Sequence, residues 1–206
     1  MMPARKALVL VDVQNDFLPG GSLAVPGGDQ IVPVLNRYLE LFHRAGLPIY
    51  ATRDWHPEHT RHFTTQGGVW PPHCVQGTRG AEFHPDLHLP PETIVVSKGM
   101  DPNEDSYSGF QGRTDDGVEF AEDLRRRGIE HLYIGGVATD YCVRHTVLDA
   151  RRAGFQVTVL EDAIRGVDLA PGDSERAVRE MAEAGALFAQ WDDVARELGA
   201  AEGATS

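Results

Sequence analysis

A cysteine stands where a strand-like segment gives way to a helical pattern. Cys142 follows the apolar run HLYIGGVA (131–138) and lies near the start of the amphipathic pattern CVRHTVLDARRAG. A thiol at a helix N-terminus faces the positive end of the helix dipole and tends to ionise, and the thiolate is the nucleophilic form. Cys142 is therefore a candidate nucleophile. The alternative is a small apolar residue that packs in the core.

Two charged residues end other strand-like runs. Asp12 lies at the end of the run at 7–13, and Lys98 lies at the end of the run at 93–99. A lysine stabilises a thiolate and a carboxylate accepts a thiol proton, so Asp12, Lys98 and Cys142 would together form an activated nucleophile. The backbone N–H groups of Ala138 and Cys142 are candidate donors to the oxyanion of an attacked carbonyl group. The alternative is that Asp12 caps a turn and Lys98 is solvated.

A second cluster could bind a metal ion. Asp54 and His56 are two residues apart, so on extended backbone their side chains share a face, and a carboxylate with an imidazole can bind a divalent transition metal. Most of the nine histidines lie between positions 56 and 88. The further candidate ligands in this segment are His59, His62, His73, His84 and His88. The spacing is not that of a zinc finger, and Cys74 is more typical of a packed thiol.

Continuous apolar runs alternate with helical patterns along the chain. The predicted strands lie at 7–13, 47–55, 93–99, 131–138, 155–163 and 186–190, and the predicted helices lie at 31–46, 118–129, 142–154 and 174–185. This alternation predicts an α/β fold with one open, six-stranded parallel sheet and helices on both faces. In such sheets ligands bind at the carboxyl ends of the strands, where Asp12, Asp54, Lys98 and Cys142 are expected to meet.

The segment at 56–91 breaks the alternation, because it shows little helix or strand pattern. It is rich in Trp, Phe and His, which argues against disorder, and we interpret it as a loop excursion that builds the site. We therefore expect a single domain over residues 1–198, followed by a flexible tail at 199–206.

Composition narrows the class of protein. The 206 residues carry a net charge of −12 with 41% hydrophobic and 24% charged residues, as in ordinary globular proteins. This charge argues against a nucleic-acid partner, because phosphate neutralisation needs clustered Lys and Arg. Two distant cysteines fit a reducing compartment, and we find neither a signal peptide nor an apolar run long enough to cross a membrane. We therefore expect a cytoplasmic protein without a membrane partner.

Five ordered motifs resemble a known family. They are VDVQNDF at 11–17, DWHPEHTRHF at 54–63, VWPPHCVQGT at 69–78, VVSKG at 95–99 and GGVATDYCV at 135–143. The chain resembles the isochorismatase-like cysteine hydrolases, and the two histidine-containing motifs are most similar to those of nicotinamidases. The resemblance extends over nearly the whole chain and implies a Rossmann-like, three-layer fold.

The resemblance implies a role for each residue of the triad. Asp12 matches the general base, Lys98 the cation that stabilises the thiolate, and Cys142 the nucleophile. The bond between Val137 and Ala138 matches a cis peptide that aims N–H groups at the oxyanion.

The resemblance also implies a metal site and a substrate pocket. Asp54, His56 and His73 match ligands of one divalent ion, expected to be zinc, iron or manganese. His62 matches a fourth ligand found in some members, although His59 is also within reach in sequence. The residues that match the walls of the pocket are Phe17, Trp70, Tyr107 and Val137.

The implied activity is hydrolysis of nicotinamide, or of pyrazinamide, to the acid and ammonia through a thioester on Cys142, as part of NAD salvage. The partner is a small pyridine carboxamide, and a homo-oligomer is compatible with the resemblance. One alternative is hydrolysis of another small amide, or of isochorismate, although isochorismate cleavage needs no nucleophilic cysteine. The other alternative is a non-catalytic metal-binding protein on the same fold.

Overall fold

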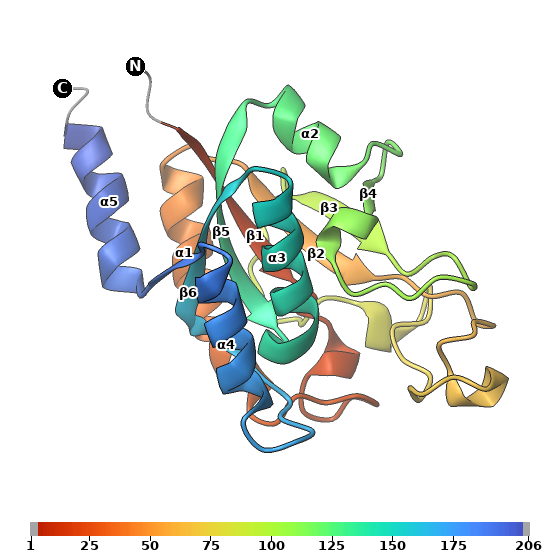
Figure 1. Cartoon of the computed structure of the whole chain (residues 1–206). Helices are drawn as coiled ribbons and strands as arrows, with labels where there is room; N and C mark the ends of the chain where they lie inside the picture. The colour runs from red at the N-terminus through yellow and green to blue at the C-terminus, as the bar shows by residue number, and fades with distance from the viewer. Residues whose placement is uncertain (1–3, 204–206) are drawn as a thin grey trace.

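A seven-stranded sheet forms the centre of the computed structural model, which describes residues 4–203 (Figure 1). The strands are β1 (Arg5–Val11), β2 (Ile49–Asp54), β3 (Ile94–Lys98), β4 (Arg113–Thr114), β5 (Ile129–Val137), β6 (Gln156–Arg165) and β7 (Leu187–Ala189). Their order across the sheet is β4-β3-β2-β1-β5-β6-β7. The α/β class is confirmed, with all six predicted strands present.

The expectation of a purely parallel, six-stranded sheet is wrong in one detail. The additional strand β4 pairs antiparallel with β3, with Val96 opposite Thr114 and Ser97 opposite Arg113. A two-residue edge strand is too short to show an alternating pattern in the sequence.

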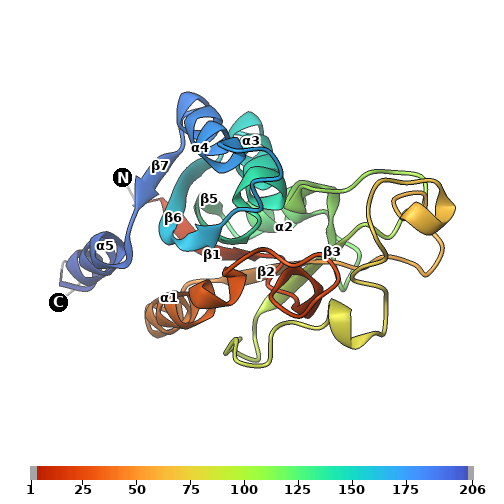
Figure 2. The ribbon, with the colours of Figure 1, turned by 90° about the horizontal axis from the view of Figure 1, so that it is seen from below.

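Helices cover both faces of the sheet, which gives three layers (Figure 2). The helices are α1 (Val32–Arg44), α2 (Phe120–Arg126), α3 (Arg144–Arg152), α4 (Asp173–Glu183) and α5 (Trp191–Gly203). On one face Phe42 of α1 shares a core with Val194 and Leu198 of α5, and on the other face α2, α3 and α4 pack together. The tail expected from residue 199 thus starts within α5, and residues 204–206 lie outside the described residues.

Strand β1 illustrates why the apolar runs become strands. Successive side chains of a strand point to opposite faces. Accordingly, Leu8 and Leu10 belong to the core beneath α1, whereas Ala7, Val9 and Val11 belong to the core beneath α2 and α3. A strand that is covered on both faces reads as a continuous apolar run. Each large side chain buried in this way contributes about 1.5–3 kcal/mol to folding.

The topology places a crevice at the carboxyl ends of the central strands. From β1 the chain builds outward through β2 and β3 on one side, and through β5, β6 and β7 on the other. Such a reversal of strand order is where open α/β sheets bind ligands. The segment at 56–91 lies beside this edge and contains two 3₁₀ turns, Thr64–Gln66 and Arg79–Ala81 (Figure 2). Within residues 4–203, no helix combines the length and the apolar character that a membrane crossing requires.

Candidate active site

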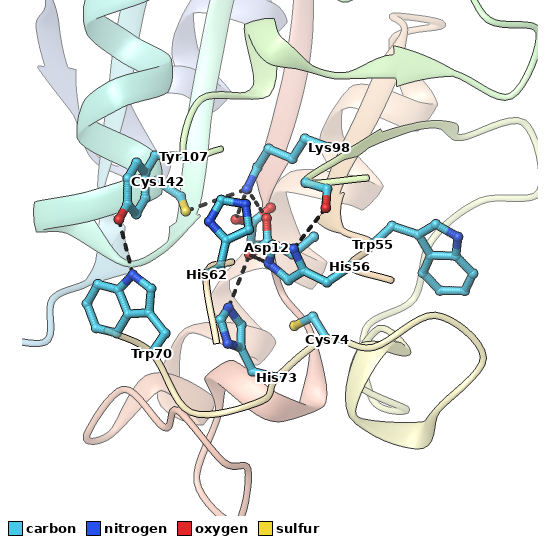
Figure 3. A network of polar contacts seen from close by, with 12 residues as sticks. Asp12, Trp55, His56, His62, Trp70, His73, Cys74, Lys98, Tyr107 and Cys142 are labelled. Carbon is cyan, nitrogen blue, oxygen red and sulfur yellow. Dashed lines mark hydrogen bonds and ion pairs between the residues drawn. The ribbon is translucent and has the colours of Figure 1, made fainter. Parts of the chain in front are cut away.

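The three strand-end residues of the predicted triad lie together. The Lys98 ammonium donates to the Asp12 carboxylate at 2.8 Å and lies 3.6 Å from the Cys142 sulfur (Figure 3). It also forms an ion pair with Asp54. All four side chains are buried, and Thr52 holds Asp12 through a 2.8 Å hydrogen bond. The alternative of a solvated Lys98 is therefore wrong.

The charges in this cluster compensate one another. Burial disfavours the ammonium group, but the carboxylates of Asp12 and Asp54 keep the pKa of Lys98 well above its ordinary value. Burial would raise the pKa of Asp54, yet Lys98 and the neighbouring imidazoles hold it well below the ordinary carboxyl value. Burial raises the pKa of Asp12, and Lys98 opposes only part of this rise. Asp12 is consequently the carboxylate in this cluster that accepts a proton more readily.

Cys142 lies in a buried helical turn directly before α3. A π-helical turn, Thr139–Val143, contains Cys142 and leads directly into α3. Burial raises the pKa of the Cys142 thiol well above its ordinary value, although the Lys98 ammonium acts in the opposite direction. Loss of hydration on burial thus acts against the ionisation that the helix start and Lys98 favour. Asp12, which contacts the same Lys98 ammonium as Cys142, lies nearby as an acceptor for the thiol proton.

A compact donor set lies beside the triad. One ligand atom each from Asp54, His56 and His73 falls within 4.8 Å of the others. The Nε2 atoms of His56 and His73 lie 3.3 Å and 3.7 Å from the Asp54 carboxylate. The Nδ1 atom of His56 donates to the Gly99 carbonyl, and that of His73 donates to the Pro71 carbonyl. Both Nε2 lone pairs are thus free to coordinate, so the residues fit a divalent transition metal.

Of the two candidates for a fourth ligand, His62 faces the site. It is buried, and its ring centroid lies 5.3 Å from that of His56, whereas His59 is exposed. Its Nδ1 atom pairs with the carboxylate of Asp105 at 2.9 Å. Its Nε2 atom is buried and has no hydrogen-bond partner among residues 4–203. His62 lies beside the compact donor set without belonging to it.

Two side chains of the VDVQNDF motif, those of Gln14 and Asp16, form hydrogen bonds to the backbone of the segments that carry the metal-ligand candidates. The Gln14 side chain bonds both backbone groups of Asp54 at 2.8 Å and also donates to the Ala81 carbonyl. The Asp16 carboxylate accepts the Cys74 N–H at 2.8 Å, next to His73. These bonds fix the end of β2 and the loop that carries His73 against the segment that follows β1.

Replacing Gln14 by alanine is expected to destabilise the protein by about 3 kcal/mol, because it leaves the buried backbone groups of Asp54 without partners. Urea unfolding measures this change. The matched control is Gln76→Ala, since the exposed Gln76 also donates to a backbone carbonyl, that of Trp55. Its effect is expected to stay within about 0.5 kcal/mol. Equal effects of the two substitutions would contradict this account.

An apolar pocket is lined by Cys142 of the triad and by the three residues of the donor set. Its walls include every residue predicted to line it, namely Phe17, Trp70, Tyr107 and Val137. Ala138 and Cys142 also line it, and the peptide bond between Val137 and Ala138 is cis, as expected. The Trp70 indole donates to the Tyr107 hydroxyl at 3.1 Å (Figure 3).

Sequence reasoning missed part of the pocket wall. The additional lining residues are Leu23, Val25, Ser106, Tyr141 and Val167. Leu23 and Val25 belong to a glycine-flanked turn that shows no element pattern, so only their apolar character could have indicated them. Tyr141 directly precedes Cys142 and could have been inferred from that position.

Other tryptophan, histidine and cysteine residues of this region lie outside the pocket. Trp55 points away from it and stacks on the Arg53 guanidinium, 3.7 Å from the ring centroid (Figure 3). His84 and His88 do not line the pocket. Cys74 is fully buried, and burial raises the pKa of its thiol well above the ordinary value, in keeping with a packed residue.

Fold and site together define an α/β protein with a buried cysteine, carboxylate and lysine at the switch point of its sheet. The chain belongs to the isochorismatase family, whose domain matches residues 6–193. The nicotinamidase of Escherichia coli is 43% identical over 212 residues, which is 93% of this chain and 99% of the relative.

The chain is also similar to solved structures. The pyrazinamidase of Pyrococcus horikoshii in complex with zinc has 48% identity and a TM-score of 0.84, covering 91% of this chain and 99% of the other. PnC1 from L. infantum in complex with nicotinate has 37% identity and a TM-score of 0.78, covering 91% of this chain and 93% of the other.

Proposed function

We propose that this protein is a metal-dependent amidase that hydrolyses nicotinamide to nicotinate and ammonia, and that it also accepts pyrazinamide. The observation that carries the proposal is that one buried ammonium, Lys98, contacts the sulfur of Cys142 and the carboxylates of Asp12 and Asp54. The nucleophile and the metal-ligand cluster line one apolar pocket, and the base contacts the same ammonium.

In the first half of the reaction, Asp12 takes the thiol proton as the Cys142 sulfur attacks the carboxamide carbon. Lys98 stabilises the negative charge that develops on sulfur, and the N–H groups of Ala138 and Cys142 are proposed to donate to the oxyanion. Asp12 then delivers its proton to the amide nitrogen. The C–N bond breaks, ammonia leaves, and a thioester joins the nicotinoyl group to Cys142.

In the second half, Asp12 accepts a proton from a water molecule, which attacks the thioester carbon. The C–S bond breaks, nicotinate forms, and the proton returns to the Cys142 sulfur. The raised pKa of Asp12 suits a group that alternately accepts and donates a proton. One carboxylate therefore serves both halves of the reaction.

Asp54, His56 and His73 would hold the divalent ion, with His62 as a fourth ligand. The ion, proposed to be zinc with iron or manganese as alternatives, would supply a Lewis-acidic contact for the pyridine nitrogen and so orient the ring. Phe17 and Trp70 would pack against the ring, and Tyr107 would border it. The two cysteines are free, which suits the proposed cytoplasmic role in NAD salvage.

Ammonia release from nicotinamide by the metal-loaded protein tests the proposal. We expect equimolar nicotinate and ammonia, similar turnover of pyrazinamide, and much weaker turnover of benzamide, which lacks the ring nitrogen. A metal-loaded protein that hydrolyses none of these amides would overturn the proposal.

Replacing Trp70 by alanine is expected to raise KM for nicotinamide about tenfold with little change in kcat, because aromatic packing of this kind is worth about 0.5–1.5 kcal/mol. Steady-state kinetics measures KM and kcat separately. The control is Tyr107→Phe, which keeps the neighbouring ring and removes only the hydroxyl that accepts from Trp70. It is expected to change KM less than about threefold, and a larger change in this control than in Trp70→Ala would contradict the assignment.

A further inference from the structure

The three buried histidines of the site share one hydrogen-bonding pattern. In His56, His62 and His73 the Nδ1 atom pairs with an oxygen of the protein, at 2.8–2.9 Å. Carbonyl and carboxylate oxygens only accept, so each Nδ1 carries the hydrogen and each Nε2 carries the lone pair. The Nε2 atoms of His56 and His73 approach Asp54, and that of His62 is buried and unpaired among the described residues.

The partners of the three rings differ in kind. His56 and His73 are held by backbone carbonyl groups, whereas His62 is held by the side chain of Asp105. The Asp105 side chain is 79% exposed, and the His62 side chain is 6% exposed. An exposed carboxylate in an ion pair contributes little to folding. Its effect at this position is instead to fix the tautomer and the orientation of a buried imidazole.

Asp105 belongs to the irregular segment between β3 and the 3₁₀ turn Gly109–Gln111, and this segment also builds the pocket wall. The two residues that follow Asp105, Ser106 and Tyr107, both line the pocket. The Gln111 side-chain amide stabilises this segment, because it donates to the Asp105 carbonyl at 2.9 Å and accepts a hydrogen bond from the Tyr107 N–H at 3.0 Å. The carboxylate on His62 and the pocket wall are therefore parts of one short stretch of chain.

We propose that Asp105 is a positioning residue that makes His62 a metal ligand and so links metal affinity to the placement of the segment that carries Ser106 and Tyr107. The inference rests on the proposed function, because it takes the histidine cluster as the site of the divalent ion. Asp105 touches neither the ion nor the substrate. It acts through the His62 ring alone.

Zn²⁺ affinity, measured by competition with a chromogenic chelator and without substrate, tests the inference. Asp105→Ala is expected to weaken Zn²⁺ binding about 10- to 100-fold, the usual cost of losing such an orienting partner. His62→Ala is expected to weaken it at least as much. The double variant should bind no more weakly than His62→Ala, because residues that act through one another do not add. If the loss of Zn²⁺ affinity in the double variant equals the product of the losses in the two single variants, the proposal is overturned.

Two further variants separate orientation from charge. Glu104→Ala removes the same charge from the neighbouring exposed position and is expected to change Zn²⁺ affinity less than about twofold, because exposed charges are screened. Asp105→Asn retains an oxygen that accepts from Nδ1 and is expected to recover most of the affinity. If Glu104→Ala matches Asp105→Ala, or if Asp105→Asn recovers nothing, the effect is one of charge and the proposal fails.

A spectroscopic measurement reports on the ligand directly. The visible absorption of Co²⁺ bound to Asp105→Ala is expected to resemble that of His62→Ala and to differ from that of the unaltered protein. An unchanged spectrum would overturn the proposal. Thermal unfolding of metal-free Asp105→Ala should stay close to that of the unaltered protein, since the Asp105 side chain is 79% exposed. If the protein shows this coupling but hydrolyses no amide, the proposed function fails and this inference stands.

Discussion

Replacing Cys142 by alanine is expected to lower kcat for nicotinamide by at least about a thousandfold, because Cys142 is the only thiol among the described residues of the pocket wall. Metal content should stay unchanged, since Cys142 lies outside the compact donor set. Ammonia release measures the activity. Mass spectrometry of the parent protein during turnover should show a covalent nicotinoyl adduct, which the variant should lack.

The second cysteine offers a matched control. Cys74 is also free and buried, and it lies next to the proposed ligand His73. Its backbone N–H, rather than its thiol, makes the bond to Asp16. Cys74→Ala is therefore expected to retain activity within a few-fold. Retained turnover in Cys142→Ala, or an adduct on Cys74, would rule out the covalent route proposed above.

Replacing Asp54 by asparagine is expected to reduce metal affinity at least about 100-fold and to raise KM strongly. A neutral amide is a far weaker metal ligand than a carboxylate. Even the loss of a residue that only orients a ligand lowers metal affinity about 10- to 100-fold, so the loss of a ligand should lower it at least as much. Lys98 would keep Asp12 as its remaining carboxylate partner. Metal analysis of the purified variant, together with KM for nicotinamide, measures both effects. Chelation of the parent protein should likewise impair turnover.

The control for Asp54→Asn is a buried carboxylate remote from the pocket. Asp123 is 8% exposed and accepts the Tyr50 hydroxyl at 2.6 Å, at the opposite end of the sheet. Asp123→Asn is expected to lower stability without changing metal content. Stoichiometric metal in Asp54→Asn would show that this carboxylate is not a ligand.

Much of the site followed from the positions of residues along the chain. Strands that run in parallel end at one edge, so Asp12, Asp54 and Lys98 could be placed together before any contact was known. The choice between His59 and His62 could not be made in this way. It depends on how an irregular loop folds, and only the structure shows that His62 is buried and His59 exposed.

Two other features of the fold are not plainly visible in the sequence, for physical reasons. The burial of Cys142, which raises the pKa of its thiol, is a property of the folded chain that its position in the sequence does not show. The tail expected from residue 199 overlaps the last residues of α5, where the sequence is rich in Ala and Gly. Val194 and Leu198, four residues apart, were the signal that one face of a helix would be buried there.

The central position of β1 has a consequence for how the chain is made. Strand β1 leaves the ribosome first, and β2 can pair with one of its edges soon afterwards, but the other edge pairs with β5, residues Ile129–Val137. At about 5–20 residues per second, that edge stays open for on the order of ten seconds. During this interval the nascent protein exposes an apolar strand edge that could pair with other chains.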